Sequence, residues 1–209
     1  MAYNRGPLVT TLVIGLAWLF SGQGAFAQAS ADQIIEALTP KPVTRSLTGQ
    51  PAQRQLSDSD RTFIESVRHR TRSLSASERD RLADIAQDRP SINLEIYFDF
   101  DSAVITPKAE PQLVELGEAL RRGSQLKDAL MLLNGHTDAR GTVDYNQQLS
   151  ERRSEAVKKY LLQRFQIPVE NLTTAGWGKQ QPKNKDDPFA AENRRVQIVN
   201  VASSVLAQP

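Results

Sequence analysis

Strand and helix patterns alternate along the second half of the chain, and this alternation constrains the fold more than any other feature. From residue 92 to residue 100, apolar and polar side chains alternate, which is the period of a half-buried β-strand. Thr106 and Pro107 then have the residue types of a helix N-cap and first turn, and Gly123 has the type that follows a helix. These residues predict one strand followed by one helix.

A second strand and helix follow in the same order. The apolar run at residues 129–133 predicts a strand, and residues 145–165 predict a helix. Residues 172–177 and residues 194–201 predict two more strands. We therefore expect an α/β domain, an α+β sandwich in βαβαβ-β order at residues 91–202, whose mixed sheet has helices packed on one face.

The segment before this domain, residues 28–90, is polar and interrupted by prolines, so it builds a core poorly. Short apolar patches predict helical turns within it, and Ser75 and Glu78 have the spacing of a capping box. We expect a short helical N-terminal arm, loosely tied together. It is interpreted as a tether with weak docking helices or, alternatively, as a partner-binding arm. Residues 203–209 are interpreted as a C-terminal tail.

Residues 1–27 have the pattern of a secretory signal peptide. Arg5 precedes an apolar run at residues 8–20, and an Ala-Phe-Ala cleavage site follows at residues 25–27. Cleavage would leave Gln28 at the N-terminus, where a lipoprotein needs a cysteine. We therefore expect an exported protein with no direct membrane anchor after cleavage.

Composition argues against several function classes. The chain has 26 Lys and Arg residues against 24 Asp and Glu residues, and this net charge of +2 gives no electrostatic reason to expect nucleic-acid binding. It has no cysteine, hence no disulfide, thiolate metal site or cysteine nucleophile. Its two histidines, His69 and His136, lie far apart in the sequence, and Ser150 and Ser154 lie on a predicted helix that has no histidine. We therefore expect no enzyme, no metal and no cofactor.

The predicted helix at residues 145–165 carries a charge on its apolar stripe. Leu149, Val157 and Tyr160 mark the face that points to the core, and Arg153 lies among them. An unpaired buried charge is costly. Arg153 must therefore meet a carboxylate or an anionic ligand, or emerge at the edge of the sheet.

A candidate partner for this charge lies in the loop after the second strand. Asp138 follows the carboxyl end of that strand, the place where open α/β folds tend to bind ligands. A carboxylate beside Arg153 could hold both poles of an amino acid, the ammonium on Asp138 and the carboxylate on the guanidinium fork. Asn146 lies on the same helix face as Arg153. The alternative is a structural salt bridge between Asp138 and Arg153 with no ligand, and spacing alone leaves both open.

Four segments in order resemble one known family. They are YFDFDSAVITPKAE (residues 97–110), GHTDARGTVDYNQQLSERRSEAVKKYL (residues 135–161), GWGKQQP (residues 176–182) and ENRRVQI (residues 192–198). The chain from residue 97 to residue 199 is similar to the OmpA-like peptidoglycan-binding domain of Gram-negative envelope proteins. The second segment is especially similar to the wall-binding lipoprotein of the Tol system, but this chain lacks the cysteine that such a lipoprotein carries.

The resemblance implies a ligand, the meso-diaminopimelate of the peptidoglycan stem peptide, and it assigns the two main contacts to Asp138 and Arg153. It implies supporting contacts from Phe100, Asp101, Asn146 and Arg194. The first two of these have an alternative as a strand-end turn. Arg194 has an alternative as an internal ion pair with Asp138 or Asp101.

The implied function is non-enzymatic binding of peptidoglycan that tethers or organises the envelope. The implied location is the periplasm, associated with the cell wall, with the outer membrane as a further location. The alternative function is an adaptor whose N-terminal arm docks envelope proteins and whose OmpA-like domain is mainly scaffold.

Overall fold

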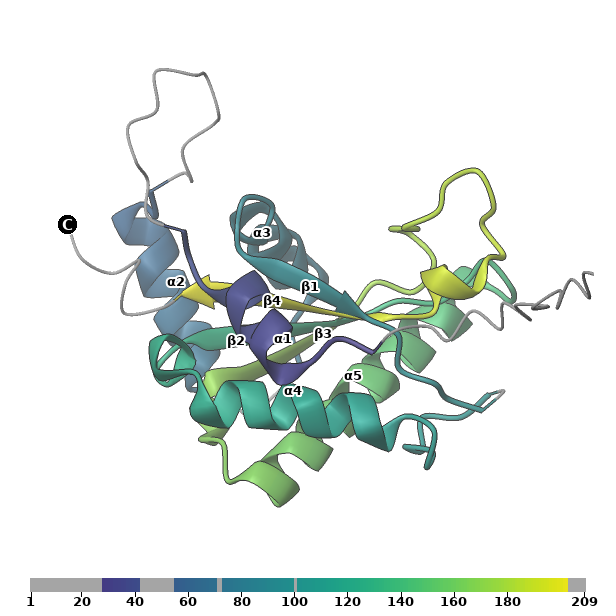
Figure 1. Ribbon diagram of the computed structural model, residues 1–209. Helices are drawn as coiled ribbons and strands as arrows, with labels where there is room; N and C mark the ends of the chain where they lie inside the picture. Colours follow the sequence, from purple (N-terminus) through teal and green to yellow (C-terminus); the bar gives the residue numbers. More distant parts are fainter. Residues whose placement is uncertain (1–27, 42–54, 71–72, 100, 203–209) are drawn as a thin grey trace, which may run out of the picture.

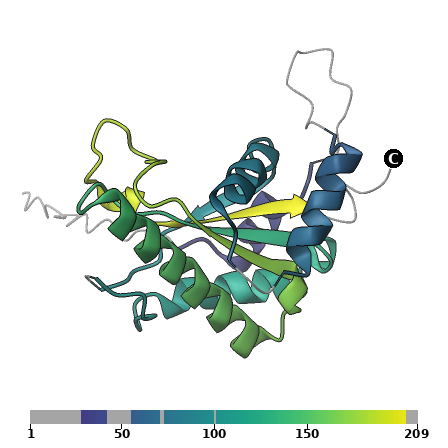
Figure 2. The ribbon, with the colours of Figure 1, turned by 180° about the vertical axis from the view of Figure 1, so that it is seen from behind.

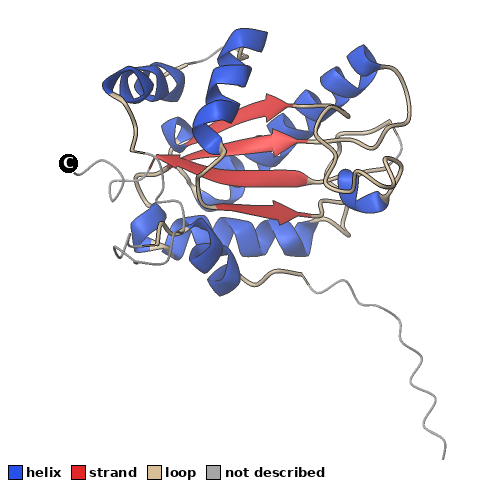
Figure 3. Cartoon of the chain, turned by 90° about the horizontal axis from the view of Figure 1, so that it is seen from above, coloured by secondary structure: helices blue, strands red, loops and turns tan. Residues whose placement is uncertain are grey.

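Four strands pair into one mixed sheet in the computed structural model, which describes residues 28–41, 55–70, 73–99 and 101–202. They are β1 (Ser91–Leu94), β2 (Leu130–Gly135), β3 (Leu172–Gly176) and β4 (Val196–Ala202), in the order β1-β4-β2-β3. β2 and β3 are parallel, and β4 is antiparallel to both β1 and β2. The predicted mixed sheet is confirmed, and the loops that follow β1, β2 and β3 gather at one end of it (Figure 3). Residues 1–27 and 203–209, predicted as a signal peptide and a tail, lie outside the described residues.

Three helices cover one face of this sheet (Figure 1). They are α1 (Ala31–Leu38), α4 (Glu110–Arg122) and α5 (Val143–Phe165). Leu113 and Leu116 of α4 and Val157 and Leu161 of α5 are fully buried against apolar strand residues such as Leu133. The predicted packing of helices on one face is thus present for the two long helices of the domain.

The prediction of helices on one face holds for the domain at residues 91–202, but two helices of the N-terminal arm, α2 (Asp58–Arg68) and α3 (Ala76–Ala86), cover the opposite face (Figure 2). Their side chains form a second apolar cluster with residues of β2, β3 and β4, and the cluster consists of Leu56, Ile64, Val67, Leu82, Ile85, Leu130, Leu132, Ala175, Val199 and Val201. The physical reason is that β2 is buried at every position, so its two faces both need a cover.

The N-terminal arm is bound to the domain rather than loosely tied together. In α1, Ile34 and Leu38 are fully buried in the first cluster. The Gln112 side chain donates to the Ala29 carbonyl (3.1 Å) and accepts from the Ala29 N–H (3.0 Å). The Asn200 side chain donates to the Leu38 carbonyl (2.9 Å). The predicted Ser75–Glu78 capping box is confirmed at the start of α3.

Two predicted boundaries were wrong. β1 ends at Leu94 rather than near residue 100, because its register with β4 ends at the pair Leu94–Val196, where β4 itself begins. α4 begins at Glu110 and not after Thr106. The Thr106 hydroxyl donates to the Tyr97 carbonyl (3.0 Å) instead of capping the helix. A turn at residues 107–109 fills the gap.

Gly135, the last residue of β2, allows α5 to lie directly against the sheet. A Cβ at this position would lie 2.2 Å from the Ser150 carbonyl oxygen, a clash with backbone that nothing nearby can relieve. This close approach brings the middle of α5 next to the loop that follows β2.

His136 comes directly after β2 and is buried as a neutral side chain. It is 2% exposed, and neither ring nitrogen has a hydrogen-bond partner in the described part of the chain. Burial, and to a smaller extent the charge of Arg195, lowers the pKa of His136 from 6.5 to about 3.

This lowered pKa predicts a loss of stability in acid. Above pH 6.5 both the folded and the unfolded chain hold a neutral His136. Between pH 6.5 and about 3 only the unfolded chain gains the proton, so the free energy of unfolding falls by about 1.4 kcal/mol per pH unit from this group as the pH decreases. Urea unfolding of wild type and His136→Gln between pH 6 and pH 4 checks this, and the variant should lose less stability. Equal slopes would contradict it.

The docked arm predicts a large effect of truncating Leu82 on α3. Leu82→Ala should lower the free energy of unfolding by about 2–5 kcal/mol, because the Leu82 side chain is fully buried in the second cluster. Leu74→Ala, a partly buried residue at the edge of the same cluster, should cost less. Denaturant unfolding measures both. A Leu82→Ala variant as stable as wild type would mean that the arm does not contribute to the fold.

Candidate ligand-binding site

Asp138 lies in the loop after β2 with its carboxylate already hydrogen-bonded. It is 6% exposed, and its Oδ1 accepts from the Arg140 backbone N–H (3.1 Å). Its Oδ2 forms an ion pair with Arg194 Nη1 (2.8 Å) and a longer one with Arg140 Nη1 (3.5 Å). The ion pair with Arg194 was one of the two predicted roles of that residue. A buried carboxylate with these hydrogen-bond and ion-pair partners is fixed in position.

Arg153 projects from the middle of α5 and is held by backbone carbonyls. It is 7% exposed, and its Nε and Nη2 donate to the carbonyls of Ser102 (3.0 Å) and Asp99 (3.4 Å). Its guanidinium lies over the Phe98 ring, 5.0 Å from the centroid. Burial lowers the pKa of Arg153, but an arginine starts so high that it stays charged near neutral pH.

Asp138 and Arg153 are not paired with each other in the described structure, where each charge has its own set of partners. The alternative of a direct salt bridge between them is therefore not the observed arrangement. Arg153 Nη1 makes no hydrogen bond to another described residue. It remains available as a donor.

Both charges line one cavity of about 240 Å³ at the carboxyl end of β2. The lining residues are Phe98, Asp99, Asp101, Thr137, Asp138, Arg140, Tyr145, Asn146, Leu149, Arg153 and Arg194. Five of the six predicted site residues are thus brought together. The sixth, Phe100, lies outside the described residues.

The cavity wall combines short hydrogen bonds with a tight loop. The Asn146 side chain donates to the Arg140 carbonyl (2.6 Å), and the Tyr145 hydroxyl donates to Asp101 Oδ1 (2.7 Å). The hydrogen bond to Asp101 raises the pKa of Tyr145. Gly141 has a φ of +88°, which a residue with a side chain rarely adopts. The loop therefore turns sharply between Asp138 and the start of α5.

Sequence reasoning missed Arg140 and Tyr145. Tyr145 lies four residues before Leu149 and eight before Arg153, so extending the helical stripe backwards would have found it. Arg140 carries no such signal, because its contact with Asp138 depends on the conformation of an irregular loop.

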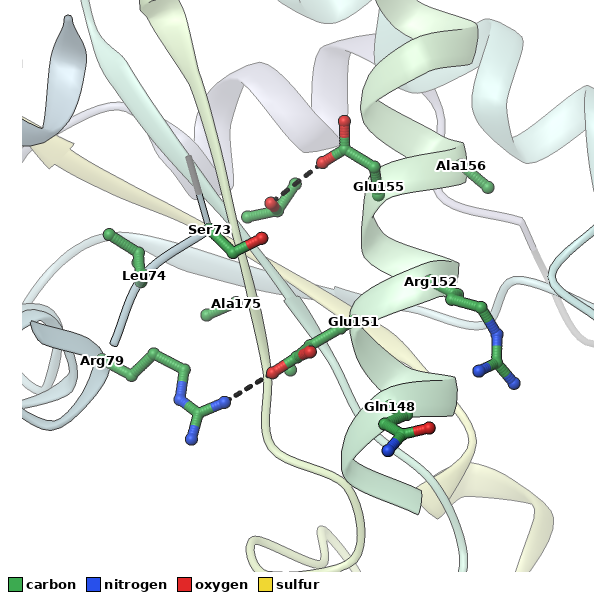
Figure 4. Close-up of a pocket in the computed structure, with 11 residues that line it drawn as sticks. Ser73, Leu74, Arg79, Gln148, Glu151, Arg152, Glu155, Ala156 and Ala175 are labelled. Carbon is green, nitrogen blue, oxygen red and sulfur yellow. Dashed lines mark hydrogen bonds and ion pairs between the residues drawn. The ribbon is translucent and has the colours of Figure 1, made fainter. Parts of the chain in front are cut away.

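A larger cavity lies elsewhere, between α3, α5 and β3, and has a volume of about 510 Å³ (Figure 4). Its charged walls include an Arg79–Glu151 ion pair (2.6 Å), and Glu155 accepts a hydrogen bond from the Thr174 hydroxyl (3.1 Å). The smaller cavity differs from it by the buried guanidinium of Arg153, which has no carboxylate partner among the described residues. We therefore take the smaller cavity as the candidate site.

The described residues contain no group of three or more His, Asp or Glu side chains placed to hold a metal ion. The His69 side chain is 73% exposed, whereas His136 is buried. No described helix is long and apolar enough to cross a membrane.

Comparisons with known proteins each match about half of the chain. Residues 97–195 match the OmpA family. A peptidoglycan-associated lipoprotein of Pseudomonas aeruginosa is 36% identical over 104 residues, which are 49% of this chain and 59% of the relative. Outer membrane protein A of Bordetella avium is 37% identical over 113 residues, 53% of this chain and 56% of the relative. The chain thus covers less than two thirds of either relative.

Among solved structures, the peptidoglycan-associated lipoprotein from Burkholderia pseudomallei is 31% identical, and the match covers 53% of this chain and 88% of that one at a TM-score of 0.42. The family match falls on the segment that contains β2, α5 and the residues that line the cavity at Asp138. The part of the chain from residue 97 to residue 195 therefore belongs to the OmpA family.

Proposed function

We propose that the cavity at Asp138 and Arg153 binds peptidoglycan without covalent chemistry, through the diaminopimelate of the stem peptide. One observation carries the proposal. A buried carboxylate and a buried guanidinium face the same cavity and are not paired with each other. Opposite charges kept apart in this way suit a ligand that carries both charges itself.

The free end of a diaminopimelate side chain has an ammonium and a carboxylate on one carbon. Asp138 can accept hydrogen bonds from the ammonium, and Arg153 can donate to the carboxylate from Nη1. Arg194 shares Asp138 Oδ2, so the ammonium would share the carboxylate with Arg194 or displace it. The Arg140 backbone N–H would keep Asp138 in place in either case.

The comparisons support the wall as the target. The Pseudomonas aeruginosa relative is named for its association with peptidoglycan and is 36% identical over 104 residues. The choice of diaminopimelate rests on the chemistry of the cavity and on the family resemblance. We further propose that this protein is periplasmic and that it tethers or organises the envelope by binding the wall.

The adaptor alternative finds less support. The apolar faces of α2 and α3 are buried against the sheet, so they are not free to dock on an envelope protein. We also infer binding rather than catalysis, since both ring nitrogens of His136 are buried.

The affinity for a single stem peptide should be modest. A hydrogen bond to a charged group contributes about 1.5–3 kcal/mol, and ordering the peptide offsets part of that. Many stem peptides along one wall can compensate through avidity.

The proposal predicts that Asp138→Ala and Arg153→Ala abolish sedimentation of the protein with purified sacculi. Arg152→Ala is the matched control, because it removes the neighbouring arginine of α5, which is exposed and lines the other cavity. Circular dichroism should show that all three variants remain folded. Arg153→Lys should also bind at least about tenfold more weakly, since a lysine cannot copy the guanidinium fork.

Free meso-diaminopimelate should compete with sacculi for the wild-type protein. If both Asp138→Ala and Arg153→Ala sediment with sacculi to the same extent as wild type, the proposed mechanism is contradicted. Loss of binding by Arg152→Ala to the same extent would instead indicate a general effect of positive charge.

A further inference from the structure

Strand β3 lies at one edge of the sheet, so part of its backbone faces away from its neighbour. Among the described strands, β3 pairs with β2 alone. The Trp177 N–H, directly after β3, donates to the Gly135 carbonyl at the end of β2 (2.9 Å). Backbone groups of successive strand residues point to opposite sides, so every second residue before Trp177 faces β2 and the others face outward. The outward-facing residues of β3 are Leu172, Thr174 and Gly176.

The two ends of this outward row have partners, and its middle has none. The Leu172 N–H donates to the Val169 carbonyl, and the Gly176 carbonyl accepts from the Gln147 side chain (2.8 Å). Between them, the Thr174 N–H and carbonyl make no hydrogen bond to a side chain or loop of the described chain. Unpaired backbone groups on an edge strand are a template for one more strand.

The cavity of about 510 Å³ between α3, α5 and β3 runs along this edge, and we call it the β3 slot. Thr174, Ala175 and Gly176 all line it. Figure 4 shows Ala175 between Leu74 on one side and Glu151 on the other. A cavity of this size has room for a short peptide segment. The unpaired backbone groups of β3 therefore face a space that a peptide can enter.

Helices from both faces of the sheet meet across the β3 slot. α3 packs in the cluster on one face and α5 in the cluster on the other. The Arg79–Glu151 ion pair (2.6 Å) joins these two helices past the edge strand (Figure 4). A second copy of the domain would bring its own helices to the same place. The β3 slot thus suits a single extended chain better than another sheet.

The two walls of the β3 slot differ in polarity. On the α5 side, the Thr174 hydroxyl donates to Glu155 Oε2 (3.1 Å), and Glu155 is exposed. On the α3 side, Ala175 belongs to the second apolar cluster, and Leu74 packs against that cluster. Side chains of an extended chain point alternately to these two sides. The walls therefore suit a segment in which polar and apolar residues alternate.

We propose that the β3 slot binds an extended segment of a partner protein, which adds to the sheet as a fifth strand beside β3. The segment would exchange backbone hydrogen bonds with Thr174. It would place apolar side chains toward Leu74 and polar side chains toward Glu155.

This site depends on the N-terminal arm. Leu74 and Arg79 precede residue 97, where the match to the OmpA family begins, so the arm and the domain build the β3 slot together. The arm thus contributes to partner binding by packing on the sheet and not by presenting free helices. The β3 slot shares no lining residue with the cavity at Asp138, so this inference is independent of wall binding.

Affinity selection from a synthetic pool of heptapeptides tests this inference with the full chain. In the pool, Val, Ile or Leu alternates with Lys, Thr or Gln. We expect wild type to retain members of the pool and Thr174→Pro to bind them about tenfold more weakly, because proline lacks the N–H that would pair. Thr174→Val is the matched control, since it keeps the backbone N–H, and it should bind as wild type does.

A second experiment leaves the protein unchanged and holds even if Thr174→Pro does not fold. N-methylation of alternate residues in a retained peptide removes the N–H groups along one edge of that peptide. Only one edge can pair with β3. One of the two alternate methylation patterns should therefore abolish binding by wild type, and the other should leave it unchanged.

Four results would overturn this inference. The first is that wild type retains no peptide, and the second is that folded Thr174→Pro binds as tightly as wild type. The third is equal loss of binding under both methylation patterns, because pairing along one edge would then not explain it. The fourth is a dimer of wild type that Thr174→Pro abolishes, which would assign the edge to a second copy. Sedimentation of Thr174→Pro with sacculi should equal that of wild type, and its loss would assign the β3 slot to the wall instead of a protein.

Discussion

Apolar side chains point from both faces of β2, and the rest of the structure depends on covering them. Met131 and Leu133 pack under α1, α4 and α5, whereas Leu130 and Leu132 pack under α2 and α3. Burial of apolar surface is the main favourable contribution to folding, so an uncovered second face would be costly. The N-terminal arm meets this requirement, and for this reason it is part of the folded unit rather than a free tether.

The same strand sets the geometry of the candidate site. β2 ends at Gly135, where α5 approaches so closely that a side chain would clash with Ser150. This contact places Arg153, one turn further along α5, beside the loop that holds Asp138. Each charge is then fixed by its own partners, Asp138 by Arg194 and the Arg140 backbone, and Arg153 by two carbonyls. The site is thus charged and held in place before any ligand arrives.

Much of this could be predicted from the sequence, because hydrophobic period and cap residues report local structure. The strand and helix order and the proximity of Asp138, Asn146 and Arg153 follow from such patterns. The packing of α2 and α3 on the second face of the sheet was not predicted. The apolar run at residues 129–133 indicated it, because a strand without alternating polar residues is buried on both faces. The end of β1 depends on where β4 begins, and the contact of Arg140 with Asp138 depends on loop conformation, so neither could be obtained from local pattern.

A crystal structure of the protein with meso-diaminopimelate tests most directly whether one cavity holds both poles of the ligand. We predict the ligand ammonium within hydrogen-bond distance of the Asp138 carboxylate and the carboxylate on the same carbon within hydrogen-bond distance of Arg153. A ligand bound in the cavity between α3, α5 and β3, or bound near Asp138 without contact to Arg153, would contradict this account.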